Sequence, residues 1–162
     1  MAQQKFSLTV DLALSASRLW AALKSFYLVF PHLAPDTKDT MEVVEGMPGE
    51  EGSIVKISLG ATPGGPVGAY SKEKTVRVDE EKMILVNMEI EGGHLSIGFK
   101  KWLTTTRLVP SGEKAVKMEV CVEYECDPTD PVCDMVVEQS REGISVTFKA
   151  VEVYLHSSDA FK

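Results

Sequence analysis

Several features that the sequence lacks each exclude a class of function. No apolar run approaches the roughly 20 residues that cross a bilayer, and no basic segment followed by an apolar one opens the chain. We therefore expect a cytoplasmic protein with no membrane partner. Basic residues are few, 17 Lys and Arg against 24 Asp and Glu, for a net charge of −7. Nucleic-acid binding rests on cations that neutralise phosphates, so we expect no nucleic-acid partner.

Cysteine and histidine are scarce too. The three cysteines are Cys121, Cys126 and Cys133; no Cys-x-x-Cys pair occurs, and no histidine clusters with them. This spacing fits neither a zinc motif nor a redox motif, so we expect reduced thiols, no metal and no cofactor. No histidine pairs obviously with a serine, cysteine or carboxylate, and we expect solvated or structural roles for His32, His94 and His156.

What the sequence does contain is the composition of one ordinary globular domain. It is 162 residues long, 44% apolar and 25% charged, so we treat 1–162 as a single domain. The last third predicts a helix of about 25 residues, because Thr129 or Asp130 is a good N-cap, Pro131 suits the first helical position and apolar residues recur at helical spacing. Such a helix needs a large apolar surface to lie on.

Strand-like segments before the helix must supply that surface. Alternation is clearest where Val116, Met118 and Val120 are separated by charged or polar residues. The predicted strands are Phe6–Leu12, Met41–Val44, Ser53–Leu59, Ala69–Val78, Met83–Ile90, His94–Leu108 and Ala115–Cys126, with turns at Ala61–Gly68 and Pro110–Gly112 and short helices near 15–23 and at Phe26–Leu33. Hairpin-length connections favour antiparallel pairing. The fold class is therefore α+β: a curved antiparallel sheet of seven strands wrapped around the long C-terminal helix, with two short helices after the first strand.

Three motifs then follow one another at a characteristic spacing: the loop Glu45–Ile54, the turn Ile90–Leu95 and the ending Phe148–Leu155. In these motifs, and over nearly its whole length, the chain resembles the plant birch-pollen-allergen (Bet v 1) family, also called pathogenesis-related class 10, of the START-like superfamily. The resemblance implies a helix-grip fold with a hollow interior that holds small hydrophobic or amphipathic ligands. Two further stretches, Tyr70–Glu73 and Leu95–Thr105, look most like the cytokinin-specific binding branch.

The glycine-rich loop departs from the family pattern. It is one residue longer than usual, has lost two glycines and has gained Pro48, Glu50 and Glu51. A loop that cradles phosphate needs free backbone N–H groups and no nearby anions. We therefore expect a structural hairpin loop here rather than a phosphate site.

The resemblance places Glu73 at the ligand-contacting carboxylate of the cytokinin-binding branch. A carboxylate in an apolar cavity can accept a hydrogen bond from a ligand N–H, and is costly there unless it is so paired. The alternative is a solvated strand residue between Lys72 and Lys74. Tyr70 falls at the family's pocket tyrosine, where a ring with a polar tip suits a ligand wall; the alternative is a strand aromatic packed in the core.

Other candidates for the cavity wall come from the later strands, the short helices and the last helix. Positions matching Trp102, Thr104 and Thr106 line the cavity in relatives. Ordinary core packing is the alternative for every one of these side chains. The remaining candidates are Phe99, Phe30, Ile144, Thr147, Phe148 and Val151.

The strand Met83–Ile90 permits two registers. Alternation of apolar residues turns Ile84, Val86 and Met88 inward, whereas matching to relatives through Asp79 and Glu91 turns inward the other set, Leu85, Asn87 and Glu89. A slip of one residue moves every side chain to the opposite face. We favour the family register, which makes Asn87 and Glu89 polar cavity groups and exposes the apolar set as a hint of a partner surface.

These residues predict a binder rather than an enzyme. Norcoclaurine synthases of the family condense dopamine with an aldehyde, using a lysine and carboxylates. Their glutamate matches Glu73, but their lysine position falls on Leu85 and their aspartate position on Thr104. We expect a carrier of a small ligand such as a cytokinin, monomeric or weakly dimeric, with no catalytic residue. The alternatives are a different condensation or isomerisation using Glu73, Glu89 or His94, and a protein–protein module with a regulatory cavity.

Overall fold

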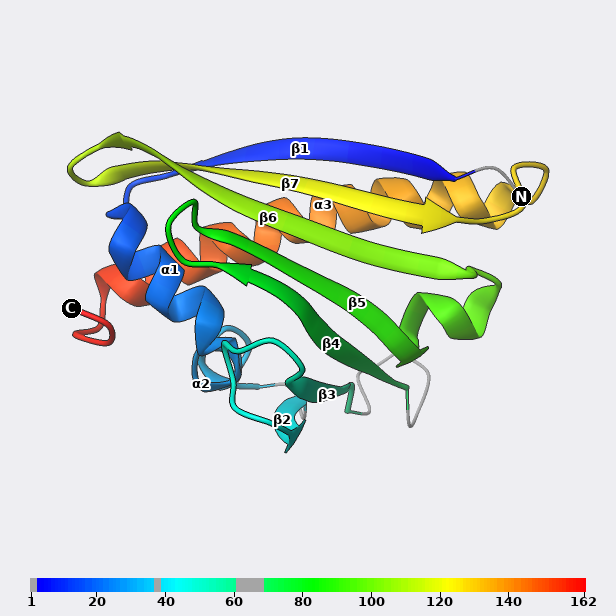
Figure 1. Cartoon of the computed structure of the whole chain (residues 1–162), viewed down its shortest axis with the longest axis horizontal. Helices are drawn as coiled ribbons and strands as arrows, with labels where there is room; N and C mark the ends of the chain where they lie inside the picture. Colours follow the sequence, from blue (N-terminus) through cyan, green and yellow to red (C-terminus); the bar gives the residue numbers. More distant parts are fainter. Residues whose placement is uncertain (1–2, 37–38, 61–68) are drawn as a thin grey trace.

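A computed structural model describes residues 3–36, 39–60 and 69–162, in which one antiparallel sheet of seven strands curves around a long helix (Figure 1). The spatial order of the strands is β1-β7-β6-β5-β4-β3-β2. The strands are β1 (Gln4–Leu12), β2 (Thr40–Glu45), β3 (Ile54–Ser58), β4 (Tyr70–Asp79), β5 (Ile84–Gly92), β6 (Lys101–Gly112) and β7 (Ala115–Glu125). This confirms the expected fold class. The turn predicted at 61–68 lies outside the described residues.

Alternation of side chains accounts for the best-ordered part of the sheet. In β7 the even positions from Val116 to Tyr124 are all buried, and the odd positions are exposed or half-buried. The neighbouring strand β1 pairs with β7 in register, so that Val10 stands opposite Met118. Both side chains are at most 4% exposed, which places them in the core between the sheet and the helices.

The two longer helices each begin at a residue whose side chain caps the first turn. Ser15 accepts a hydrogen bond from the Arg18 N–H and starts α1 (Ala16–Lys24); Asp130 does the same for Val132 at the start of α3. The long helix α3 (Pro131–His156) has 26 residues, close to the predicted length. Between α1 and β2 the chain forms α2 (Phe26–Val29) and the 3₁₀ helix η1 (Phe30–His32), a bracket that packs its aromatic rings on α3.

Helix α3 lies along the edge strand β1 and covers some of its unpaired carbonyl groups. Arg141 Nη1 donates to the carbonyl of Ser7, and Lys149 Nζ donates to that of Asp11, each at 2.7 Å. Arg18 of α1 in turn donates to the Leu155 carbonyl near the end of α3. The cations thus satisfy backbone acceptors of the edge strand and of the last helical turn.

The predicted strand His94–Leu108 is wrong at its start. Residues Gly93–Ile97 form a 3₁₀ helix, η2, and β6 begins only at Lys101. Gly92 and Gly93 have φ of 69° and 52°, and a Cβ on Gly92 would collide with the Tyr70 carbonyl oxygen. These glycines let the chain fold back sharply instead of continuing extended. At the other end, Pro110 and Gly112 lie within β6, with an irregularity between them, so the reversal comes after the predicted turn.

The expectation of three reduced thiols is also wrong. Cys126, after β7, and Cys133, in the first turns of α3, form a disulfide with their Cα atoms 6.2 Å apart. The tight turn between the strand and the helix brings together two cysteines whose spacing matches no short motif. Cys121 stays free. None of the helices in the described ranges is long and apolar enough to cross a membrane.

Candidate functional site: an internal cavity

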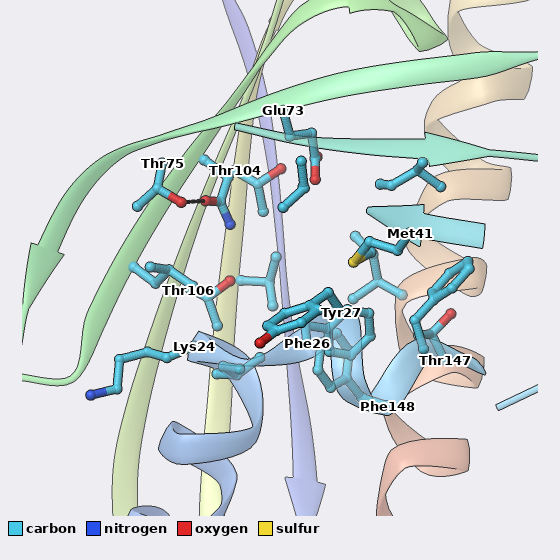
Figure 2. Close-up of a pocket in the computed structure, with 18 of the residues that line it drawn as sticks. Lys24, Phe26, Tyr27, Met41, Glu73, Thr75, Thr104, Thr106, Thr147 and Phe148 are labelled. Carbon is cyan, nitrogen blue, oxygen red and sulfur yellow. Dashed lines mark hydrogen bonds between the residues drawn. The ribbon is translucent and has the colours of Figure 1, made fainter. Parts of the chain in front are cut away.

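A cavity of about 700 Å³ lies between the concave face of the sheet and the helices α1, α2 and α3 (Figure 2). Its volume is in the range of sites that hold small organic molecules. Much of its wall is apolar and aromatic, formed by Leu23, Phe26, Phe30, Met41, Val55, Ile57, Leu59, Leu85, Trp102, Val120, Ile144 and Phe148. The interior is therefore hollow on this side of the sheet.

Polar side chains reach the cavity from successive strands. Thr75 of β4 donates a hydrogen bond to Asn87 Oδ1 of β5 at 3.0 Å, marked by the dashed line in Figure 2. Because the amide oxygen is engaged there, Asn87 offers its NH₂ group as a donor. Thr104 and Thr106 of β6 lie on the same wall. A ligand would thus meet a row of hydroxyl and amide groups along an otherwise apolar surface.

Glu73 of β4 also points into the cavity (Figure 2). Its side chain is half-buried and faces the space between the sheet and the helices. Removal from bulk water and, to a smaller extent, the nearby Glu89 raise the pKa of Glu73 to about 7, although His94 acts in the opposite direction. Glu73 is therefore a group that can change its protonation state near neutral pH.

Tyr70 and Glu73 lie on opposite faces of β4. Residues three apart in a strand face opposite sides. Tyr70 is 37% exposed, lies outside the cavity wall and donates a hydrogen bond from its hydroxyl to Glu91 Oε2 at 2.9 Å. That bond raises the pKa of Tyr70 above its usual value.

Strand β5 adopts the register that we favoured from the family resemblance. Leu85 and Asn87 line the cavity, and Glu89 is buried on the same face. The opposite face is less exposed than expected, since Val86 is only 8% exposed between its cross-strand neighbours Arg77 and Thr105. The expected partner surface on this strand is therefore incomplete.

Glu89 does not face the cavity directly but holds His94. Its Oε1 lies 2.9 Å from His94 Nδ1, and its Oε2 accepts from the His94 backbone N–H at 3.1 Å. The other ring nitrogen, Nε2, lies 3.2 Å from Oγ of Ser140 on α3. His94 and Ser140 both line the cavity. The expectation that His94 pairs with no serine or carboxylate is therefore wrong.

Aromatic rings fix the His94 imidazole further. It stacks on Trp102 with the ring centroids 3.5 Å apart and the planes within 3°. Phe99 meets it edge-on at 5.7 Å and is itself only 2% exposed. Phe99 thus supports the wall from behind instead of lining it.

Most of the predicted wall residues lie together, and four do not. The cavity is lined by Glu73, Leu85, Asn87, Trp102, Thr104, Thr106, Phe30, Ile144, Thr147 and Phe148. Tyr70, Glu89, Phe99 and Val151 lie outside it. Val151, almost one turn beyond Phe148 on α3, is fully buried in the core.

Sequence reasoning missed several wall residues. Residues two apart in a strand lie on the same face. Thr75 could therefore have been found from Glu73, and Val55 and Ile57 could have been recognised as a pair on one face of their strand. The loop that we expected to be structural contributes Pro48 and Gly49, and packs against Lys24 of α1. The other missed wall residues include Leu23, Phe26, Tyr27, Met41, His94 and Ser140.

A curved sheet closed by a long helix around a cavity defines a hollow, ligand-holding class of protein. This chain belongs to the pathogenesis-related protein Bet v 1 family, whose model matches residues 1–157. Proteins of this family bind small hydrophobic ligands.

Individual relatives agree with that assignment. Norbelladine synthase of Narcissus pseudonarcissus is 30% identical over 120 residues, which cover 73% of this chain and 72% of that protein. Pathogenesis-related protein 1 of Asparagus officinalis is 30% identical over 156 residues, covering 96% and 95% of the two chains. The norcoclaurine synthase of Thalictrum flavum in complex with dopamine and hydroxybenzaldehyde shares the fold, with a TM-score of 0.76, 21% identity and coverage of 98% and 90%.

Proposed function

We propose that this protein binds a small amphipathic aromatic ligand in its cavity, with a cytokinin-type N-substituted adenine as the best-fitting class. The observation that carries the proposal is the Glu73 carboxyl group facing an otherwise largely apolar cavity. A carboxylate in such a place is stabilised when a ligand N–H donates to it. The Asn87 amide and the threonine hydroxyls supply further partners for a ring with polar edges.

Calorimetric titration with an N-substituted adenine tests the proposal. Replacing Glu73 by alanine removes a charge-assisted hydrogen bond and should weaken binding by roughly 1.5–3 kcal/mol. The matched control is Glu119→Ala, because Glu119 is an exposed carboxylate of β7 outside the cavity. Unchanged affinity in Glu73→Ala would remove this residue from the ligand site, and no binding to the wild type would remove the adenine class.

A second candidate function is an enzyme that condenses or isomerises aromatic substrates. It is favoured by a cavity carboxyl group whose pKa of about 7 suits a general acid or base, and by the similarity to norbelladine synthase. Leu85 and Thr104, at the lysine and aspartate positions of norcoclaurine synthases, argue against that particular reaction. Lys24 reaches the wall, but its amine is paired with Glu80 at 2.8 Å. Turnover of dopamine with hydroxybenzaldehyde that disappears in Glu73→Gln would favour the enzyme; binding without turnover favours the carrier.

The proposal also includes a monomeric or weakly dimeric protein in the cytoplasm. The Cys126–Cys133 disulfide bears on the compartment, because the cytosol keeps most thiols reduced. Alkylation of free thiols in cell extracts, followed by mass spectrometry, distinguishes the cases. Three alkylated cysteines fit the cytoplasm, and a single alkylated Cys121 fits an oxidising compartment.

A further inference from the structure

Two side chains of the cavity wall and a third behind it form a chain of hydrogen bonds that the binding of a ligand does not require. Ser140 Oγ lies 3.2 Å from His94 Nε2, and His94 Nδ1 lies 2.9 Å from Glu89 Oε1. A hydroxyl within hydrogen-bond reach of a base, with the base oriented by a third group, is the arrangement that activates a serine nucleophile. We propose that Ser140, His94 and Glu89 form a nucleophile, base and orienting carboxylate that hydrolyse aryl esters bound in the cavity.

The proposal assigns one role to each imidazole nitrogen. Glu89 Oε2 accepts from the His94 backbone N–H, and Glu89 Oε1 lies 2.9 Å from His94 Nδ1. With the ring proton on Nδ1 and donated to Oε1, Nε2 presents its lone pair to the Ser140 hydroxyl. In this tautomer the imidazole can take a proton from serine.

The backbone around His94 is shaped so that this geometry can form. Gly93 has φ of 52°, and a Cβ there would collide with Glu89 Oε1. Only a residue without a side chain brings His94 back onto the carboxylate five residues earlier. The stacked Trp102 ring then prevents the imidazole from turning. The base is thus held on both edges and on one face before any substrate enters.

The reaction is a hydrolysis that needs water and no other co-reactant. Ser140 Oγ bonds to the ester carbonyl carbon while its proton moves to His94 Nε2. The bond to the aryl oxygen then breaks, and the leaving phenolate takes that proton. Water next bonds to the acyl carbon as His94 accepts its proton, and Ser140 Oγ leaves and recovers the proton. The products are a phenol and a carboxylic acid.

The site favours aryl esters over alkyl esters for two reasons. The cavity wall carries aromatic side chains, Phe26, Phe30 and Phe148 among them, that suit an aryl group. A phenolate is also a better leaving group than an alkoxide, so the tetrahedral intermediate needs less stabilisation by the protein. Esters of phenols with small acids fit within about 700 Å³.

The test uses the full chain, 4-nitrophenyl butyrate as substrate and a fluorophosphonate as a covalent probe of activated serines. We expect saturable release of 4-nitrophenol and one fluorophosphonate adduct, which peptide mapping places on Ser140. Ser140→Ala should abolish the adduct and lower the hydrolysis rate at least about 100-fold, and His94→Gln should do nearly the same. Ser145→Ala is the control, because Ser145 lies on the same helix outside the cavity wall.

Glu89 acts through His94, so it is a positioning residue and needs its own readout. Glu89→Gln keeps the shape but can donate to Nδ1, which favours the wrong tautomer. We expect kcat to fall at least about tenfold while KM stays within about twofold of the wild type, because the base is misoriented but the substrate still binds. An unchanged kcat would overturn this role.

The outcomes separate this proposal from the proposed binding function. Hydrolysis that survives in Ser140→Ala, or an adduct on another residue, would overturn the serine mechanism even if the cavity binds adenines as proposed. The absence of any adduct from the wild type would overturn it as well. Urea denaturation of Ser140→Ala shows whether the variant is folded, so a lost rate there reports on the nucleophile whether or not the cavity binds adenines.

Discussion

The interior of this protein has a solid region and a hollow one, and the same sheet and helices build both. In the solid region β1 and β7 pack against α1 and the end of α3, where Leu19, Met118 and Leu155 have no exposed surface. In the hollow region β3, β4 and β5 face the cavity, and all five residues of β3 are half-buried. The comparison shows that polar residues on the inner face of the sheet gather where the interior is hollow. Glu73, Asn87 and Thr104 all lie on the hollow side.

The largest expected effect compares two leucines of α1. Leu19 belongs to the solid region, whereas Leu23, one turn later, lines the cavity. Leu19→Ala leaves a new void in a packed core and should lower the free energy of unfolding by about 3–4 kcal/mol. Leu23→Ala only enlarges an existing space, and should cost about 1 kcal/mol. Urea denaturation of the two variants gives both values, and equal losses would contradict the division of the interior.

A smaller effect concerns the protonation of Glu73. Its pKa of about 7 in the folded protein lies above the unfolded value of 4.5. The folded state therefore holds the proton more tightly than the unfolded state does. The stability that protonated Glu73 contributes is complete below pH 4.5 and is lost as the pH rises through about 7. Glu73→Gln cannot ionise, and should be more stable than the wild type by about 2 kcal/mol at pH 8, with the difference shrinking toward pH 4.5.

Urea denaturation of wild type and Glu73→Gln at pH 4.5, 6 and 8 measures that difference. Glu119→Gln controls for the loss of a carboxylate at an exposed position of the same sheet. A constant difference between wild type and Glu73→Gln across this range would mean that the carboxyl group is in contact with bulk water.

The solid region could be predicted from sequence because its contacts repeat along the chain. Alternation defines β7, and the Asp130 cap and Pro131 define the start of α3. The hollow region was harder, because an apolar side chain shows the same pattern whether it faces a core or a cavity. Thr75 was within reach by alternation from Glu73, and the register of β5 came from matching to relatives.

The contacts around His94 could not be predicted for a different reason. The glycines before it fold the chain onto Glu89, and Ser140 reaches it from 46 residues away. Neither spacing has a period that a strand or helix would reveal. The disulfide is similar, since Cys126 and Cys133 meet across a turn between two elements. Contacts between residues of different elements depend on how those elements pack, and the packing is determined by the whole chain.

The smallest expected effect tests whether the outer face of β4 takes part in ligand binding. Tyr70→Phe removes a hydroxyl that bonds Glu91 on the outer side of the sheet, away from the cavity wall. We therefore expect the affinity for an N-substituted adenine to stay within about twofold of the wild type, a difference well below 1 kcal/mol. Calorimetry of Tyr70→Phe beside Glu73→Ala makes the comparison on one strand. If the tyrosine variant bound as weakly as the glutamate variant, the ligand would have to extend around the strand, and the inner face would not be the whole site.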